Sequence, residues 1–588
     1  MNCRGRSSGK KRNAMHVWET QPVDERLERE LCRTLLLSPL EARLLATRGI
    51  GTVEDGVQFL NPSLENLHDP FLFNEMEPAA RMLHETITRG ERILIHGDYD
   101  ADGVCGTALL FEVLARLGAD VHFFVPDRAK DGYGLAARVM DRGFEVGLKL
   151  VVSVDCGSSD REVIAALAAR GVKVLVTDHH ETAGRVPEAH AFINPKLPGE
   201  RYPFKELTGT GVAFKLLQGL ERTMGLDLSL AEHLDLVALG TLGDNGAMRD
   251  ENRILVPAGL KLLRQWRRPG LRALRAESGL SESGFSARQV SFTLVPRLNS
   301  PGRMGSAREV VELLVTRDDA EAARIASEIE EKNRRRKLHD SRVTEEACYL
   351  ADIVLRRSEP RALVFSSSSW HEGVVGIGAA RLAERYNKPS ILIAVREGVG
   401  KGSARSAGMV NVKAALELCS EHLLEFGGHR EAGGFSIREE AIPDFQKMFE
   451  EVVEELSRCP AAPCVFKVDA EVPLGACSLE LFSFIERLGP FGVGNPEPVL
   501  VVGGLEVLPG TRVVGDGHLK LEARDREGDV RSLIGFSLAG AWKPADITGT
   551  KVDVLINLRK NVYKGKVEPQ LQIMSIRFSE RMQGAGLS

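Results

Sequence analysis

The sequence lacks any uninterrupted apolar run that approaches the roughly 20 residues a membrane-spanning helix needs. Its start, Met1-Asn-Cys-Arg-Gly-Arg-Ser-Ser-Gly-Lys-Lys-Arg12, also lacks the apolar centre of a secretory signal. We therefore expect a cytoplasmic protein with no membrane partner. The basic leader has the composition of a solvated, disordered tail, and contact with phosphate groups is the alternative.

Paired cysteine motifs are also missing. The nine cysteines are scattered from Cys3 to Cys477 without a Cys-x-x-Cys pair, and the nearby Cys459 and Cys464 have no matching partners. This pattern argues against a disulfide framework and against a structural zinc site. We expect reduced thiols.

The chain has no excess of positive charge, because its formal net charge is −5 at pH 7. That balance gives no sign of nucleic-acid binding, but a basic groove can be embedded in an acidic protein. With 588 residues, of which 43% are hydrophobic, the chain is long enough for about three to five domains.

Short runs rich in Val, Ile and Leu alternate with amphipathic helical patterns between Arg92 and Asp244. This alternation is typical of a parallel sheet with helices on both faces. Polar residues follow nearly every run, and the ligand crevice of such a sheet lies just past the carboxyl ends of its strands. The expected strands are Ile93–Ile95, Ala119–Val125, Leu150–Val154 and Val172–Val176.

A long linking helix is expected over residues 318–356, where the sequence has helical periodicity, heavy charge and no Gly or Pro. Its run Arg334-Arg-Arg-Lys is interpreted as a solvated face, with DNA contact as the alternative. The apolar runs Ala362–Phe365 and Ser390–Ala394, with a helix through Arg381 between them, predict a second, smaller α/β domain. The Pro-rich segment near Pro460 is interpreted as a linker.

From Val465 onward, short alternating runs are separated by Gly-rich turns, as in a small barrel. An OB-like barrel would suit single-stranded nucleic acid, although the aromatic residues that hold bases are sparse. The runs are Val499–Val502, Gly517–Ala523, Val552–Ile556 and Pro569–Ile573. The expected organisation is an N-terminal segment (1–60), a parallel-sheet catalytic domain (61–317), the linking helix (318–356), the second α/β domain (357–455) and the barrel (465–580).

The strongest chemical motif is His96-Gly-Asp98-Tyr-Asp100-Ala-Asp102-Gly103, directly after an apolar run. Clustered carboxylates repel one another, so bringing them together costs free energy unless a cation neutralises them. A turn stabilised by Asp and Gly is the alternative, but a turn does not need three aspartates and a histidine. The motif predicts a metal site.

Two more apolar runs end in ligand types, the first in Asp155 and the second in Asp178-His179-His180. Mixed carboxylate and imidazole ligands suit Mn²⁺ or Mg²⁺. One carboxylate could bridge two ions, and a pair of metals about 4 Å apart can polarise a phosphoryl oxygen and activate a bridging water. Phosphoester hydrolysis is therefore the expected chemistry.

The Asp178-His179-His180 triplet, together with His96-x-x-x-Asp100-x-Asp102, is similar to the motifs of the DHH phosphoesterase superfamily. From about Arg92 to the C-terminus the chain resembles the bacterial RecJ branch of that superfamily. Further segments occur in family order: Pro126-Asp-Arg128-Ala-Lys-Asp-Gly-Tyr-Gly, Asn194-Pro195, Pro203-Phe-Lys-Glu, Pro296-Arg-Leu-Asn299 and Gly302-Arg303-Met. The resemblance implies DHH, DHHA1 and OB domains and a metal-dependent 5′→3′ exonuclease specific for single-stranded DNA.

The resemblance also implies the metal ligands. The first ion would be held by His96, Asp100 and Asp155. The second would be held by Asp102, Asp155, His179 and Asp244, with Asp155 bridging. Asp98 and Asp178 would orient ligands, although Asp98 could also ligate directly, and His180 would face the scissile phosphate. Arg303 would stabilise the charge on that phosphate.

A second group of motifs resembles the DHHA1 domain that accompanies this catalytic domain: Trp370-His-Glu-Gly-Val-Val-Gly-Ile, Gly402-Ser403-Ala-Arg405-Ser406 and Gly427-Gly428-His429-Arg-Glu-Ala-Gly433-Gly434. Glycines let a backbone approach a phosphate closely, and Ser403, Arg405 and His429 supply donors to anionic oxygens. A Gly-Gly pair alone would indicate only a turn. In the family, a 5′-phosphate pocket is expected to be lined by Arg128, Ser403 and Arg405.

The chain departs from the family pattern beside two of the implied ligands, at Asp244-Asn-Gly-Ala-Met248 and Asp155-Cys-Gly-Ser-Ser-Asp160. Metal affinity or rate could therefore differ. Two other functions remain open: a DHH enzyme that hydrolyses pyrophosphate or very short oligonucleotides, and an inactive DNA-binding scaffold. The extra barrel favours a polymer over a small ligand, and the complete set of ligand types argues against an inactive site. Single-strand-binding protein and a repair helicase are the partners that the resemblance implies, in recombination and repair.

Overall fold

The computed structural model describes residues 17–128, 130–132, 134–137, 147–182, 184–280, 285–408, 410–457, 465–563 and 565–579. The leader Met1–Arg12 and the Pro-rich segment around Pro460 lie outside the described residues. The chain divides into two compact units, one formed by the described parts of 68–246 and 258–461, the other by those of 1–67, 247–257 and 462–588. Among the described helices, none has both the length and the apolar character needed to span a membrane.

The larger unit contains the predicted parallel sheet, in the order β3-β2-β4-β5-β6. All four neighbouring pairs are parallel. The strands are β2 (Arg92–His96), β3 (Val121–Phe124), β4 (Leu148–Val154), β5 (Lys173–Thr177) and β6 (Ala191–Ile193). Their carboxyl ends therefore form one row along a single edge of the sheet, which confirms the predicted fold class and places the acidic motifs side by side.

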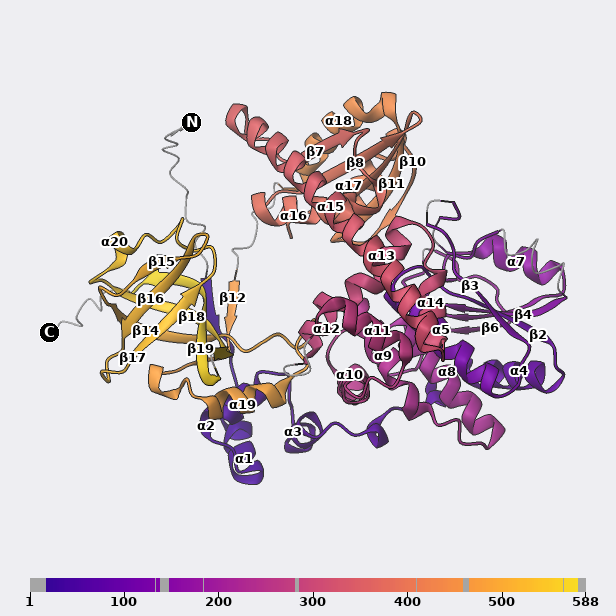
Figure 1. Ribbon diagram of the computed structural model, residues 1–588, viewed down its shortest axis with the longest axis horizontal. Coiled ribbons are helices and arrows are strands. Elements are labelled where there is room, and N and C mark those ends of the chain that lie inside the picture. Colours follow the sequence, from indigo (N-terminus) through magenta and orange to yellow (C-terminus); the bar gives the residue numbers. More distant parts are fainter. Residues whose placement is uncertain are drawn as a thin grey trace. The chain divides into compact units, whose positions relative to one another are not determined.

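Helices cover both faces of this sheet. Successive side chains of a strand point to opposite faces, so the two faces can be told apart by the contacts of β4. Val154 packs against α5 (Ala101–Arg116), where a Cβ at Gly106 would lie 2.6 Å from its Cγ1. Val151 belongs instead to a core that includes Ile164 and Leu167 of α7 (Arg161–Ala169). Figure 1 shows the layers. Other helices of the chain before the linking helix are α4 (Met76–Thr88), α8 (Gly209–Met224), α9 (Leu234–Gly243), α10 (Asp250–Leu263), α11 (Pro269–Ser278), α12 (Ala287–Thr293), α13 (Val295–Met304) and α14 (Arg308–Val315).

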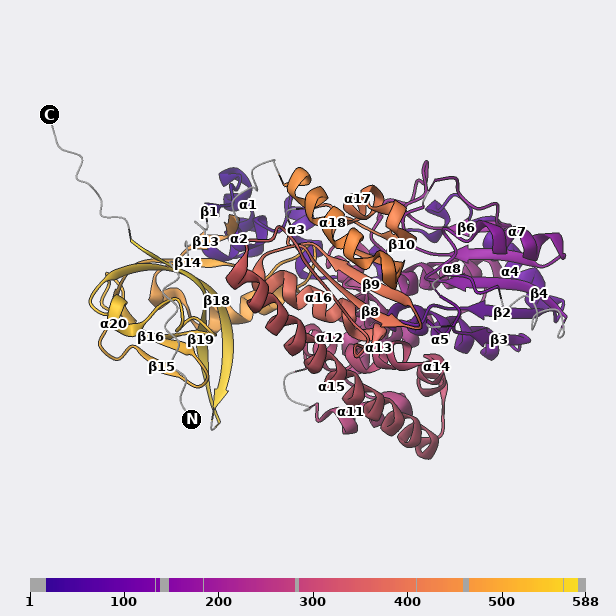
Figure 2. The same ribbon diagram turned by 90° about the horizontal axis from the view of Figure 1, so that it is seen from above.

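The predicted linking helix is α15 (Asp319–Arg357), whose first part packs on α11 and α13 and whose later part lies along α16 (Glu372–Tyr386) (Figures 1 and 2). In its basic run, Arg334 is exposed and paired with Glu331, whereas Arg336 is half-buried and donates to Asn333 Oδ1 at 3.0 Å. The basic run is therefore not one uniformly solvated face.

The second sheet has the order β10-β11-β9-β8-β7, and only β7 and β8 are parallel. One face packs on α16 (Glu372–Tyr386), and the other packs on α17 (Val412–Leu418) and α18 (Ile442–Leu456). The strands are β7 (Leu363–Ser367), β8 (Ser390–Arg396), β9 (Val399–Arg405), β10 (Leu423–Gly428) and β11 (Ala432–Arg438). The predicted smaller α/β domain is confirmed.

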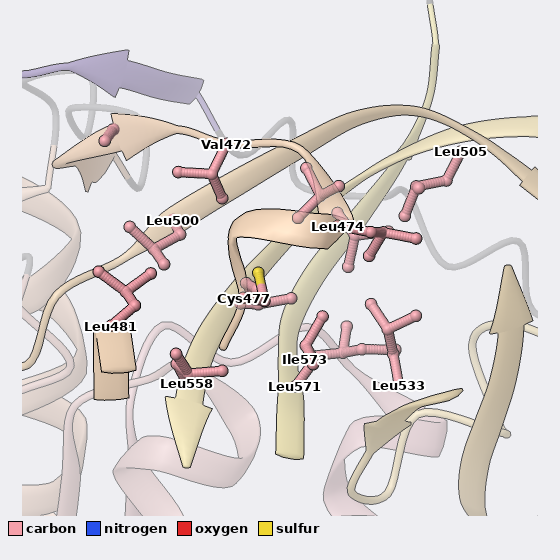
Figure 3. Packing of buried hydrophobic residues seen from close by; sticks show 14 of the residues in the cluster. Val472, Leu474, Cys477, Leu481, Leu500, Leu505, Leu533, Leu558, Leu571 and Ile573 are labelled. Atoms are coloured by element: carbon pink, nitrogen blue, oxygen red, sulfur yellow. The ribbon is translucent and has the colours of Figure 1, made fainter. Parts of the chain in front are cut away.

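The other unit contains a β-barrel with the strand order β13-β14-β18-β19-β17-β16-β15, closed by a β14–β16 pairing. Apolar side chains of alternating strand positions fill its interior, as Figure 3 shows for Leu500, Leu533, Leu558 and Leu571. The elements are β12 (Val465–Val468), β13 (Ala470–Glu471), β14 (Leu500–Val507), β15 (Arg512–Val514), β16 (His518–Arg524), β17 (Val530–Gly535), β18 (Lys551–Tyr563), β19 (Lys566–Phe578), α19 (Leu479–Leu488) and α20 (Pro544–Ile547).

The N-terminal segment shares the barrel's core. Strand β1 (Val17–Thr20) pairs in parallel with β12, and Leu31 and Leu44 lie in the same apolar cluster as the barrel residues. The buried Asp469 accepts a 2.6 Å hydrogen bond from Thr47 Oγ1 and forms an ion pair with Arg48. The helices are α1 (Glu25–Leu35), α2 (Pro39–Ala46) and α3 (Val53–Leu60).

Candidate metal centre and phosphate pocket

The acidic motif after β2 is folded around the start of α5. Asp100 caps this helix, because its Oδ1 accepts the amides of Asp102 and Gly103 at 2.8 and 3.1 Å. Gly103 is required here, since a Cβ at that position would lie 2.6 Å from the amide nitrogen of Asp98. Helix capping thus determines where Asp100 lies, and the close approach of Gly103 places Asp98 beside the start of the same helix.

Asp102 is held by the N-terminus of a second helix, α8. Its Oδ2 accepts the amide of Gly209 at 2.6 Å, and its Oδ1 accepts the amide of Thr210 at 2.9 Å. Helix N-terminal amides are unpaired donors with partial positive charge, so they stabilise a carboxylate there. Two backbone amides of α8 therefore fix the orientation of Asp102.

Asp155 follows β4 with a backbone φ of 62°, in the left-handed region that a non-glycine residue rarely adopts. Its side chain is buried, and its Oδ1 has no hydrogen-bond partner. The backbone of α8 approaches it closely, since a Cβ at Gly209 would lie 2.5 Å from Asp155 Cβ. This strained, close-packed position directs an unsatisfied carboxylate oxygen into the site.

The loop after β5 is organised by Asp178. Its Oδ1 accepts the amide of His179 at 2.7 Å and lies 2.8 Å from His180 Nδ1, while its Oδ2 accepts the amide of Ser158 at 2.9 Å. Burial would raise the pKa of Asp178, but hydrogen bonding by His180 and the charges of both histidines hold it below its usual value. Asp178 is thus well placed to orient both imidazoles.

These loops bring together three groups of side chains whose ligand atoms lie within 4.8 Å of one another. His179 Nε2 lies 3.0 Å from Asp155 Oδ1 and 3.8 Å from both Asp102 Oδ2 and Asp244 Oδ2. The groups are Asp98, Asp100 and Asp155; Asp102, His179 and Asp244; and Asp155, His179 and His180.

The electrostatics of the site favour a cation. Burial and the charges of neighbouring aspartates raise the pKa of Asp155 well above its ordinary value, and burial and Asp102 raise the pKa of Asp244 to about 8. Burial lowers the pKa of His179 to about 4, and the charge of Lys196 acts in the same direction. Carboxylates that repel one another beside a neutral imidazole fit Mn²⁺ or Mg²⁺. Asp98 Oδ1, Asp155 Oδ1 and His179 Nε2 are buried and form no hydrogen bond, although the last two atoms lie 3.0 Å apart, and this supports the fit.

His96 lies outside these three groups. It is fully buried, its Nε2 accepts the amide of Ala136 at 3.1 Å, and its Nδ1 lies 3.7 Å from Cys156 Sγ. Burial lowers its pKa to about 4, so the ring is neutral. Of the six implied metal ligands, the structure therefore brings five together and directs the His96 ring toward the Ala136 backbone.

A cluster of arginines lies at the N-terminus of α16. Arg303, at the end of α13, donates to the carbonyl of Gly373 at 3.4 Å, and a Cβ at Gly373 would lie 2.1 Å from the Arg303 carbonyl oxygen. Burial and the charges of Arg128, Arg336 and Arg405 lower the pKa of Arg303 to about 10. Converging like charges beside helix N-terminal amides are suited to an anion such as phosphate.

Strand β9 contributes Ser403 and Arg405 to this cluster. Arg405 Nη1 donates to Ser403 Oγ at 2.8 Å, and a Cβ at Gly376 of α16 would lie 2.9 Å from Arg405 Nη2. Gly427 and Gly428 are on β10, with Gly427 two strands away from Ser403 in the same cross-strand row. His429 occupies the turn after them, where its Nδ1 accepts the amide of Glu431.

Three residues that support the site were not assigned roles from the sequence. Asn299 Oδ1 accepts the amide of Ala101 at 2.7 Å and so fixes the start of α5. The buried Asn194 donates to both Ser158 Oγ and the carbonyl of His180. Arg336 of α15 adds to the charge around Arg303. Both asparagines lie in segments that resembled the family, but only contacts between distant loops show what they do.

Three family models match the chain: the DHH family N-terminal domain over residues 92–241, the DHHA1 domain over 359–455 and the RecJ OB domain over 468–575. The single-stranded-DNA-specific exonuclease RecJ of Bacillus subtilis is 34% identical over 567 residues, which cover 96% of this chain and 71% of that protein.

Solved structures agree with these matches. RecJ from Thermus thermophilus in complex with Mn²⁺ superimposes with a TM-score of 0.81 at 31% identity, covering 97% of this chain and 81% of that chain. Its complex with Mg²⁺ gives a TM-score of 0.74 at 30% identity, covering 97% and 79%. Similarity over nearly the whole sequence, with the same three domains in order, shows that the chain belongs to the RecJ family.

Proposed function

We propose that the protein is an exonuclease that removes nucleotides from the 5′ end of single-stranded DNA with two divalent metal ions, Mn²⁺ or Mg²⁺. The observation that carries this proposal is the presence, in one unit, of a buried carboxylate–imidazole centre and a cluster of arginines at a helix N-terminus. The names of the RecJ relatives support DNA as the substrate. The RecJ OB domain match supports a role for the barrel in binding single strands.

The metal ions would be held by the residues gathered after β2, β4, β5 and α9. When bound, a pair of divalent ions supplies an activated water and polarises the phosphoryl oxygens. Asp155, with its buried and unsatisfied Oδ1, is suited to contact both ions. Asp98 and Asp178 would orient the ligands, and His96 would reach a metal only if its ring turned away from the Ala136 amide.

The arginine cluster would hold the phosphates of the substrate. Arg128, Ser403 and Arg405 would bind the 5′-terminal phosphate, with Gly427, Gly428 and His429 forming its outer rim. Arg303, whose charge interacts with those of Arg128, Arg405 and Asp100, would stabilise the scissile phosphate, and His180 would face it. Water would attack the scissile phosphorus, and its bond to the 3′ oxygen of the terminal nucleotide would break. The shortened strand then carries a new 5′ phosphate that the same cluster can bind.

The test is digestion, with Mn²⁺, of 5′-labelled and 3′-labelled DNA in single-stranded and duplex form. We expect release of label from the 5′ end of single strands and its loss in Asp155→Ala. Arg405→Gln should remove any preference for a 5′ phosphate over a 5′ hydroxyl while hydrolysis continues. Release from the 3′ end, or equal digestion of duplex DNA, would contradict the proposal.

We also propose that this activity serves recombination and repair in the cytoplasm. Single-strand-binding protein and a repair helicase would be the partners, since both produce or cover the single strands that such an enzyme consumes. Affinity chromatography with the purified full chain against each partner tests this, and the result is independent of the hydrolysis assay.

A further inference from the structure

The catalytic sheet carries positive side chains beyond both ends of its row of carboxylates. Arg128 follows β3 at one edge of the sheet, and Lys196 follows β6 at the other. β4, which is followed directly by Asp155, lies two strands from each edge, or about 10 Å at about 4.8 Å per strand. A DNA strand whose 5′ end is held near Arg128 and whose scissile phosphate lies at Asp155 would thus continue toward Lys196.

A cavity of about 450 Å³ lies at the Lys196 edge, large enough for a nucleotide unit. It is lined by Glu181, Thr182, Pro195, Lys196, Leu197 and Lys205. With two lysines and one glutamate, its lining side chains carry a net charge of +1. Lys205 Nζ is oriented by its hydrogen bond to the carbonyl of Glu200 at 2.7 Å. Within the described part of the chain, no hydrogen bond or ion pair engages Lys196 Nζ.

Asn194 connects this cavity to the catalytic loops. Its side-chain amide donates to Ser158 Oγ at 3.0 Å and to the carbonyl of His180 at 2.9 Å, and its Oδ1 accepts the amide of Lys196 at 2.8 Å. Asn194 is fully buried, so this bridge is shielded from water. The backbone of Lys196 is therefore held at a fixed place relative to the His179–His180 loop.

We propose that Lys196, assisted by Lys205, binds a phosphate of the retained DNA strand on the 3′ side of the scissile bond. Lys196 is then a positioning residue: it holds the strand across the carboxylate row without touching the reacting atoms. The half-buried Leu197 offers apolar surface to the adjoining base or sugar. The proposal rests on the proposed exonuclease function and adds a subsite that matters only for substrates with a phosphate beyond the scissile one.

The test compares two 5′-phosphorylated substrates with Mn²⁺, a dinucleotide and an oligonucleotide of about twelve nucleotides. The dinucleotide has a terminal and a scissile phosphate but none beyond. Lys196→Gln should lower kcat/KM for the longer substrate about tenfold, mostly through KM, as expected for a lost charge-assisted hydrogen bond. It should leave the dinucleotide unaffected. Lys149→Gln is the matched control. Lys149 is also exposed, but it lies near the amino end of β4, whereas Lys196 follows the carboxyl end of β6.

A binding measurement separates this proposal from the proposed function. In an Asp155→Ala background, the slope of log affinity for the oligonucleotide against log salt should fall by about 0.7 when Lys196 is changed to Gln. Equal loss on both substrates, or no loss on either, would overturn the subsite. If the parent enzyme hydrolyses neither substrate, the exonuclease proposal fails, and an unchanged salt slope would then overturn the lysine contact as well.

Discussion

Arg268 connects the two helices whose ends carry the metal-site carboxylates, and its removal should destabilise the larger unit. Its Nε lies 2.7 Å from Asp235 Oδ2 on α9, and its Nη1 lies 2.5 Å from Glu112 Oε2 on α5. All three side chains are at most 6% exposed. Arg268→Met would therefore leave two buried carboxylates without this partner.

The expected cost can be worked out from typical magnitudes. Breaking a buried ion pair by removing one partner costs about 3–5 kcal/mol. The low end applies, because Arg317 remains 2.8 Å from Glu112 Oε1. A unit of about 380 residues has an unfolding entropy of about 0.8 kcal/mol/K, so about 3 kcal/mol corresponds to a midpoint lowered by about 4 °C.

The deficit should depend on pH. Burial would raise the pKa of Glu112, but hydrogen bonding by His233 and the charges of Arg268 and Arg317 hold it below its usual value. In the native protein this contribution is present above the unfolded pKa of Glu112 and is lost as the pH falls. Without Arg268, burial is less opposed and favours the protonated carboxyl, so the deficit of Arg268→Met should be larger at pH 8 than at pH 5.

Calorimetry of the full chain measures these midpoints, since it can resolve the two units as separate transitions. Arg324→Met is the control, because its ion pairs with Glu321 and Glu328 lie on the exposed surface of α15 and should shift no midpoint measurably. Changing Glu112 to Gln and Asp235 to Asn together with Arg268→Met should recover part of the loss. A deficit no larger than that of the control, or one independent of pH, would refute the reasoning.

Three further predictions concern the site and the barrel. Gly209→Ala should lower kcat/KM for single-stranded DNA by about 100-fold with the fold retained, because its Cβ would displace Asp155. Steady-state kinetics tests this against the control Gly211→Ala, whose new Cβ would lie nearest to the Leu207 side chain, at 3.2 Å, and equal activities would contradict the prediction. Mn²⁺ should raise the unfolding midpoint of the larger unit alone, and it should fail to do so in Asp155→Ala. Calorimetry with and without a chelator measures these midpoints, and a Mn²⁺-induced shift that persists in Asp155→Ala would place the metal elsewhere. Leu571→Ala should destabilise the barrel unit by about 2–5 kcal/mol in denaturant unfolding, because Leu571 is 1% exposed within the core shown in Figure 3. A loss of stability below about 1 kcal/mol would mean that the core is not packed as described.

The sequence predicted the sheets well, because their strands are continuous apolar runs with polar residues directly after them. The runs Leu150–Val154 and Val172–Val176 could be recognised without any distant contact. The place of the N-terminal segment could not, because β1 pairs with β12 across more than 440 residues of sequence. Likewise, nothing local to Leu31 or Leu44 indicates that they pack in the core of the C-terminal barrel.

The candidate site was predictable to the extent that strand ends determine it. Asp155 and His179 lie together because they follow adjacent parallel strands, which the spacing of apolar runs already indicates. The orientation of His96 was not predictable, because it depends on the Ala136 amide, about 40 residues away. The bridging role of Asn194 is hidden for the same reason: its three partners come from different loops.

The chain's own amides and imidazoles contact the carboxylates of the site and position them. Asp100 is held by the amides at the start of α5, Asp102 by those of α8, and Asp178 by the amides and imidazole of its own loop. Folding therefore assembles mutually repelling side chains in advance, and the surrounding structure must offset that repulsion. The buried pairing of Arg268 with α5 and α9 opposes the separation of the helices that carry these charges. A cation that enters such a site meets ligands already in place, so little of its binding free energy is spent on ordering them. For this reason, loss of Arg268 should weaken Mn²⁺ binding as well as stability, although Arg268 touches none of the residues proposed to hold the metal.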